Sequence, residues 1–431
     1  MPDAEDDPLI GPQLKPSFGN LFGLFTLPHV GAFYGGRTLA AIGIWMEQLV
    51  TGWLVWDMTG SATWLGVITF LRLAPAILLG LIGGVLTDRM WPLDLMRICK
   101  IAVVLGFASL TLLLALDLLT IWVLGALIAF IGSMQSLGNP ANKAFVWNLV
   151  PKHWLPVAIP VGSITFNLAA FIGPAFAGAL IAWQGVLTAY IVALALQAVF
   201  LIVLLRLNVP RSSQDDHRIA DAGQIALRHS LADGARYIIQ DASMRAVLVL
   251  HLLFAVCARP LIPLMPAVAV VLFNGDAQTV GLLTACIGAG AIFGGLWLAS
   301  RSRIEGLAQL LMIFMVLLMT LVIALALVRW TPAGFAILFA VGICMIVRAS
   351  GTQTLLQFAV EDQMRGRVMG YYGLFLKGGS AFGALLVGLL TDLTSLPVAL
   401  ITAAALGGIG LAAMGQSFLA AGRQVEIDAT S

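Results

Sequence analysis

Residues 371–388, YYGLFLKGGSAFGALLVG, are long and apolar enough to cross a bilayer as a helix, yet they carry Lys377 near their middle. About 20 predominantly apolar residues span the hydrocarbon core as an α-helix. An ammonium at the centre of such a helix costs about 2.5 to 3.5 kcal/mol on insertion scales. The stretch therefore predicts a membrane-spanning helix whose lysine faces protein, water or a ligand rather than lipid.

The composition of the whole chain agrees with this stretch. Apolar residues make up 60% of the 431 residues and charged residues only 10%, which predicts an integral membrane protein. A net charge of +2 with no basic run excludes a nucleic-acid partner. The four cysteines stand singly without metal-ligand spacing, and no GxxxxGK followed by Ser or Thr is present. We therefore expect no metal, no cofactor, no ATP site and no enzymatic activity.

Charges, prolines and glycine clusters divide the apolar sequence into runs of spanning length. The division predicts an all-α protein of twelve transmembrane helices. The predicted spans are 29–56, 64–87, 95–116, 119–140, 156–182, 186–206, 245–272, 279–300, 306–328, 332–358, 367–391 and 395–419.

The basic residues predict the orientation, because Lys and Arg in short loops are retained in the cytoplasm. With the N-terminus inside, fifteen basic residues between Arg89 and Arg367, Lys100 among them, fall in cytoplasmic loops, and Arg329 alone falls outside. Both termini are thus expected in the cytoplasm.

The same division predicts how the chain is organised along its length. In the long loop, Leu227, Leu231, Ala235 and Ile238 recur at helical spacing, which predicts an amphipathic helix on the inner membrane surface or a plain tether. The predicted regions are a cytoplasmic tail (1–28), a six-helix half (29–206), a cytoplasmic linker with this helix (207–244), a second six-helix half (245–419) and a cytoplasmic tail (420–431).

A weak internal repeat supports two related halves. A shift of 210 residues places Gly173 opposite Gly383 and Gly178 opposite Gly388, and it sets Asn167 opposite Lys377. The shift equals the six-span period, which is typical of duplicated transporter halves.

Several motifs resemble those of the major facilitator superfamily, in particular the bacterial exporter branch that includes enterobactin-type siderophore and macrolide efflux proteins. The resemblance implies a monomeric secondary transporter of the bacterial inner membrane, working by rocking of two six-helix halves. The motifs are GIWMEQLVTGWLVWDMTGSATWLGVITF (43–70), GGVLTDR (83–89), NPANKAFVWNLVP (139–151), SITFNLAAFIGPAFAGALI (163–181) and TLLQFAVEDQMRGRVMG (354–370).

Two of these motifs imply gating residues by resemblance. Gly84, Asp88 and Arg89 match the superfamily's cytoplasmic gate motif, and Arg365 and Arg367, between spans 10 and 11, are further gating candidates. The basic residues that usually follow the Asp-Arg pair are absent, so the charge relay is incomplete and Asp88 could be a plain loop charge. Gly173-Pro174 resembles an exporter signature whose first glycine is Ala169 here, and its alternative is a packed bend.

The charged residues inside the predicted spans indicate the charge of the transported substrate. At about 3 kcal/mol each, five lipid-facing cations would cost about 15 kcal/mol, so most of them face protein or water. Glu47, the one comparably deep acid, can neutralise only one of them, which leaves a positive field that favours an anion. By resemblance, all five lie on spans that reach the central cavity. The five are Arg37, Arg72, Arg259, Arg348 and Lys377.

Further polar residues join the candidate site. Gln48 shares a helix face with Arg37, and Asn167 is the repeat counterpart of Lys377, so both are substrate-binding candidates. Glu47 is the candidate proton carrier, with a structural ion pair as the alternative. Lys377 could instead bind a carbonyl or snorkel, and His251 is interpreted as a packing residue rather than a proton relay.

The sequence thus predicts a proton-coupled transporter that exports a small amphiphilic anion, either siderophore-like or drug-like, by alternating access. The expected partners are this substrate, protons and the lipid bilayer. Two alternatives remain open: a carrier of lipid-like or neutral drugs, and a scaffold or sensor that uses the same fold without transport.

Overall fold

The structure of this chain is a computed structural model that describes residues 23–209, 227–301 and 305–430, and every regular element in these ranges is helical. Its α-helices are α2 (Val30–Thr59), α3 (Ala62–Leu73), α4 (Pro75–Arg89), α5 (Pro92–Ala115), α6 (Ile121–Leu149), α7 (Leu155–Arg206), α9 (Leu227–Gln240), α10 (Ala242–Cys257), α11 (Met265–Phe273), α12 (Ala277–Ser300), α13 (Leu307–Leu327), α14 (Thr331–Ala359), α15 (Asp362–Leu393) and α16 (Leu396–Thr430).

These helices make twelve membrane spans. Ten described helices are long and apolar enough to cross a membrane, and the bent pair α3–α4 adds an eleventh span. The twelfth comes from α7, whose 52 residues are interrupted at Gly185 by a backbone turn with φ of 84°. Glycine adopts this positive φ without steric cost, so the chain reverses there between two spans. The predicted fold class is confirmed.

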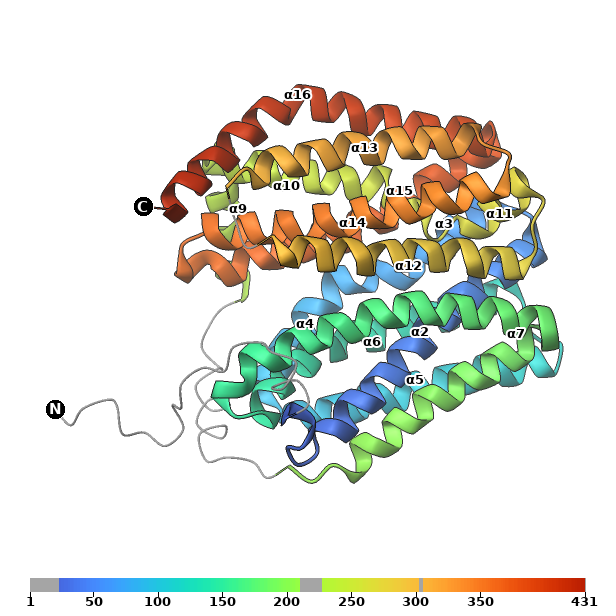
Figure 1. The fold of residues 1–431 in the computed structure, drawn as a ribbon. Coiled ribbons are helices and arrows are strands. Elements are labelled where there is room, and N and C mark those ends of the chain that lie inside the picture. Colours follow the sequence, from blue (N-terminus) through green and yellow to red (C-terminus); the bar gives the residue numbers. More distant parts are fainter. Residues whose placement is uncertain (1–22, 210–226, 302–304, 431) are drawn as a thin grey trace.

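The spans form two six-helix halves. In Figure 1 α2 and α4 to α7 of the first half (blue to green) lie below the second half, α10 to α16 (yellow to red), and α3 reaches up beside α15. The halves meet where α3 packs against α15 and α7 packs against α12. We call the end of the bundle where α7 finishes and α10 begins the linker end. The opposite end, which carries Gly60, Gly185 and Thr394, is called the loop end.

One span of the second half is broken where the site is built. α10 ends at Cys257, a short 3-10 turn covers Arg259–Leu261, and α11 begins at Met265. Pro260 has no N–H to donate and its ring clashes with the preceding turn, so a regular helix cannot continue through it. The break places the guanidinium-bearing Arg259 at a turn within the span.

The connection between the halves contains α9. Ile238 on this helix is 7% exposed, and a Cβ added at Gly234 would lie 3.2 Å from Cβ of Arg367 on α15. α9 therefore packs against the linker end of the second half. Leu227 and Leu231, which belong to the predicted apolar stripe, lie outside the residues whose side chains are described.

Candidate functional site

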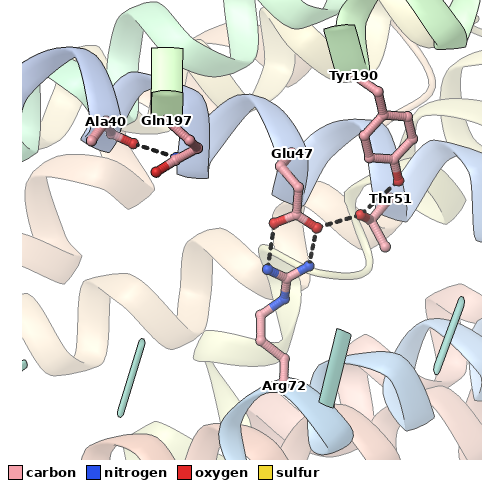
Figure 2. Close-up of polar contacts among 6 residues, drawn as sticks. All are labelled: Ala40, Glu47, Thr51, Arg72, Tyr190 and Gln197. Atoms are coloured by element: carbon pink, nitrogen blue, oxygen red, sulfur yellow. Dashed lines mark hydrogen bonds and ion pairs between the residues drawn. The ribbon is translucent and has the colours of Figure 1, made fainter. Parts of the chain in front are cut away.

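The deepest carboxylate of the first half forms a bidentate ion pair. Glu47 of α2 is fully buried, and Arg72 at the end of α3 has a side chain that is 10% exposed. Arg72 Nη1 donates to Glu47 Oε2 at 2.6 Å and Arg72 Nη2 donates to Oε1 at 2.7 Å (Figure 2). The two charges neutralise each other, so Arg72 is not a free cation in this conformation.

A short chain of hydroxyl groups supports this pair. Thr51, one turn along α2, donates to Glu47 Oε1 at 2.6 Å, and its oxygen lies 2.9 Å from the hydroxyl of Tyr190 on α7 (Figure 2). A threonine hydroxyl has one hydrogen, which is already donated to the carboxylate. Tyr190 must therefore donate to Thr51, and the chain of donors runs from Tyr190 through Thr51 to Glu47.

A second cation of the first half, Lys100, is half-buried and has a neutral partner. Lys100 Nζ donates to Oε1 of Gln197, which is fully buried on α7 and donates from Nε2 to the carbonyl of Ala40 at 2.9 Å. The ammonium also lies 5.0 Å from the centroid of the Phe200 ring. The prediction that Lys100 lies in a cytoplasmic loop is wrong, because α5 already begins at Pro92 and carries this residue more than two turns into the helix.

The second half holds a different arrangement, built by α10, α14 and α15. Arg348 of α14 is 2% exposed and donates from Nη1 to Nδ1 of His251 on α10 at 3.3 Å. The His251 ring stacks on Tyr372 of α15 with centroids 4.1 Å apart, and the Tyr372 hydroxyl donates to the carbonyl of Ala349 at 3.0 Å. The guanidinium of Arg348 also lies 5.4 Å from the ring centroid of Phe254.

Arg259 adds a second guanidinium to this cluster. It interacts electrostatically with His251, Arg348 and Tyr372 from the broken span, and it is half-buried. No carboxylate forms an ion pair with Arg259 or Arg348 among the residues that the structure describes. The second half therefore concentrates positive charge without an acid to offset it.

The remaining substrate-binding candidates are more dispersed. Arg37 is half-buried against α7, where a Cβ added at Gly162 would lie 3.4 Å from its Nη1. Gln48 and Asn167 are also half-buried. Lys377 is half-buried on α15 and interacts electrostatically with another cation, Lys143 of α6. Within the described ranges neither Arg37 nor Lys377 forms an ion pair.

The two halves are joined at the loop end by a carboxylate. Asp392, near the end of α15, accepts hydrogen bonds from the backbone N–H groups of Ala62 and Thr63 at 2.9 Å each, and from the hydroxyl of Ser61 at 2.5 Å. These donors form the start of α3, whose first N–H groups have no partner within the helix. A residue of the second half thus caps a helix of the first half.

Close backbone contacts between the halves lie at the same end. A Cβ added at Gly178 of α7 would lie 2.8 Å from Cα of Gly281 on α12, so the two helices touch where neither residue has a side chain. No comparable contact exists toward the linker end at Gly84, Gly370 or Gly373, where an added Cβ would meet no atom within 4 Å. The halves are therefore closed against each other at the loop end and apart at these linker-end positions.

The predicted gating residues lie on both sides of this separation. Asp88 and Arg89 are exposed at the end of α4, and Asp88 makes no hydrogen bond or ion pair with another residue of the described chain. Arg365 is exposed at the start of α15, and Arg367 Nη1 lies 3.4 Å from the sulfur of Met364.

Gly173 and Pro174 lie at a crossing of three helices. A Cβ added at Gly173 would lie 2.7 Å from Cβ of Trp45 on α2, and the carbonyl of Pro174 would lie 2.7 Å from a Cβ added at Gly281 on α12. The motif thus permits close packing of α7 against its own half and against the other half.

Comparison with known proteins identifies the family. The model of the family described as "Transmembrane secretion effector", MFS_3, matches residues 32–430. The staphyloferrin A transporter of Staphylococcus aureus is 22% identical over 84% of this chain and 89% of its own. The enterobactin exporter EntS of Salmonella choleraesuis is 29% identical over 92% of both chains.

Solved transporter structures share the fold. A single-residue mutant of the nucleoside transporter NupG superposes with a TM-score of 0.69 at 13% identity, covering 89% of this chain and 99% of that one. A bacterial homologue of the lysosomal transporter Spinster gives a TM-score of 0.69 at 14% identity, covering 96% and 99%. Together with the family match over nearly the whole length, these likenesses show that this chain belongs to the transmembrane secretion effector family of the major facilitator superfamily and is a multi-pass membrane transporter, not an enzyme.

Proposed function

We propose that this transporter exports a small amphiphilic anion, of the siderophore type, from the cytoplasm across the bacterial inner membrane by proton-coupled alternating access. The likeness to an enterobactin exporter and a staphyloferrin A transporter supports this type of cargo and the outward direction. The negative charge of the cargo is proposed from the side chains of the second half.

The main support for the proposal is that two cations, Arg348 and Arg259, interact with each other electrostatically. No carboxylate of the described chain forms an ion pair with either of them. In the first half, Glu47 offsets Arg72, so that pair carries no net charge. Burying an arginine without a counterion is costly, and such residues in transporters mark substrate or ion pathways. An anionic cargo would supply the missing negative charge.

The positions of the contacts between the halves support alternating access. Contacts at Asp392 and at Gly178 and Gly281 hold the loop end closed, whereas a Cβ added at Gly84 or Gly370 at the other end would meet no atom within 4 Å. With the linker end in the cytoplasm, as the basic residues predict, this conformation is inward-facing. Rocking of the halves would open the loop end and bring Asp88 toward the second half.

Glu47 remains the proposed proton carrier. Protonation would remove the charge that holds Arg72 in its bidentate geometry and would release that guanidinium toward the interface between the halves. Because the proton gradient of the inner membrane points into the cell, proton-driven export requires the proton and the anion to cross in opposite directions, so Glu47 would bind its proton in alternation with the cargo.

Everted membrane vesicles test the anionic cargo directly, because export appears as uptake into the vesicles. Uptake of staphyloferrin A, a carboxylate siderophore, is measured in vesicles with the transporter and in empty membranes. The measurement is repeated with competing pairs of a carboxylate and its carboxamide. The proposal predicts that the carboxylate of each pair inhibits at least about tenfold more strongly, since one ionic hydrogen bond is worth about 1.5 to 3 kcal/mol. Equal inhibition by both members would favour a neutral or lipid-like cargo.

A further inference from the structure

Three polar groups in the second half are buried without a hydrogen-bond partner in the described chain: Nε of Arg348, Nε2 of His251 and Oγ1 of Thr352. Arg348 is 2% exposed, and His251 and Thr352 are fully buried. Buried polar groups almost always have a partner in folded proteins, and an unpaired group costs about 1 to 3 kcal/mol. Arg348 contacts His251 and lies one helical turn before Thr352, so a single ligand bound beside these three side chains would supply the missing partners.

The chemistry of the three groups specifies what is missing. Arg348 can only donate, so Nδ1 of His251, which lies 3.3 Å from Arg348 Nη1, must be the acceptor. The imidazole is therefore neutral and carries its proton on Nε2, which makes the unpaired Nε2 a donor. Arg348 Nε is likewise a donor, so neither nitrogen has an acceptor with hydrogen-bond geometry in the described chain, although the His251 ring also interacts with the backbone of Tyr372.

The hydroxyl of Thr352 differs from those of several other threonines in the described helices. Thr352 lies one turn after Arg348 on α14 and hence on the same helix face. Its hydroxyl has no partner in the described chain, whereas a threonine inside a helix commonly donates to the carbonyl four residues earlier. In this chain that bond, at 2.7 to 2.8 Å, is made by Thr38, Thr59, Thr69, Thr87, Thr111 and Thr284.

We propose that His251 Nε2, Arg348 Nε and Thr352 Oγ1 bind the carboxylate of the transported anion. A carboxylate has two oxygens with about four acceptor positions, whereas one water accepts only two hydrogen bonds. Its charge also offsets Arg348 and the neighbouring Arg259, which a water cannot do. This inference rests on the proposed function for the identity of the ligand, and it adds His251 and Thr352 to the residues that select it.

Binding to the purified transporter in detergent tests the site separately from transport. Benzoate is titrated as the probe, with benzamide as its neutral isostere and chloride as a simple anion, and the melting temperature is followed, because a ligand of the folded state raises it. Wild-type protein is expected to be stabilised by benzoate but not by benzamide or chloride. A response to chloride alone, or to no anion, would overturn the proposal.

Paired variants separate the binding role from a structural one. Thr352→Val removes the hydroxyl at nearly constant shape and should weaken benzoate binding about tenfold, whereas Thr352→Ser should retain it. His251→Asn keeps an acceptor near the position of Nδ1 for Arg348 but lacks the Nε2 donor. This variant should also bind benzoate about tenfold more weakly.

The unliganded protein supplies a second measurement. Because the Thr352 hydroxyl is unpaired in the described chain, Thr352→Val should melt at or above the wild-type temperature without benzoate, whereas loss of a structural hydrogen bond would lower it. Unchanged benzoate affinity in Thr352→Val would overturn the site. If export in vesicles still preferred carboxylates in that case, the proposed function would stand without these residues.

Discussion

The carboxylate of Asp392 in the second half accepts the backbone N–H of Ala62 in the first half at 2.9 Å. The contact connects residues 330 positions apart in the chain and lies at the loop end, on the start of α3. A negative charge at a helix N-terminus is favourable because the free N–H groups carry partial positive charge. The closed loop end is thus held by a bond that the opposite rocking state must break.

Replacing Asp392 by Asn should shift the transporter toward opening at the loop end. Asparagine has one acceptor oxygen for three donors, and its NH₂ group would face an N–H group. Double electron–electron resonance between spin labels at Met58 and Leu393, in a background without the native cysteines, would show a larger population of long distances. Both labelling positions are exposed.

Asp276 offers a matched control for this experiment. Its carboxylate accepts from Thr279 N–H at 2.9 Å within the same helix start, and this hydrogen bond holds the pKa of Asp276 below its usual range. Asp276→Asn should therefore leave the Met58 to Leu393 distances unchanged. An identical shift in both variants would mean that Asp392 is an ordinary helix cap rather than a contact that sets the conformation.

The contact between Gly178 and Gly281 gives an independent prediction. Alanine at Gly178 would place Cβ 2.8 Å from Cα of Gly281, a distance that real Cβ atoms essentially never show, so the backbones must move apart. We expect Gly178→Ala to populate the state open at the loop end and to slow export. Gly408→Ala, where an added Cβ meets no atom within 4 Å, should export normally because alanine favours helix. Normal export by both variants would exclude close packing as part of gating.

Glu47 can be tested for proton coupling by separating its charge from its structural role. Glu47→Gln leaves Arg72 buried without a counterion, which should destabilise the protein by about 3 to 5 kcal/mol and abolish proton-driven export. The double variant Glu47→Gln with Arg72→Met removes both charges and should recover the melting temperature. If the double variant also recovered proton-driven export, Glu47 would be only half of a structural ion pair.

The spans could be predicted from the sequence because crossing a membrane depends on a local property, the length of an apolar run. The predicted span 119–140 ends nine residues before Leu149, where α6 ends, because Asn139-Pro140 was interpreted as a break, whereas Pro140 lies inside the helix. The charge of Lys100 counts it among the loop residues, although it also falls inside the predicted span 95–116. In the structure its ammonium donates to the buried amide of Gln197, 97 positions away in the chain.

The partners of the buried charges could not be predicted, because they depend on how helices pack. Hydropathy indicated that Glu47 would neutralise one cation, but only the crossing of α2 and α3 selects Arg72. The sequence interprets His251 as a packing residue and does not reveal its contact with Arg348, which lies 97 positions away in the chain. One member of the proposed carboxylate site could have been found from the sequence. Thr352 follows Arg348 by one helical turn and therefore lies on the same helix face.

The most direct test of the anionic cargo is the rate of uptake of the carboxylate siderophore staphyloferrin A into everted vesicles by Arg348→Gln, compared with Arg329→Gln at equal membrane levels. Arg329 is exposed at the loop end and serves as the matched control. Loss of the buried guanidinium should reduce uptake at least about tenfold, because an ionic hydrogen bond is worth about 1.5 to 3 kcal/mol, whereas the control should retain wild-type uptake. Wild-type uptake by Arg348→Gln would contradict the account.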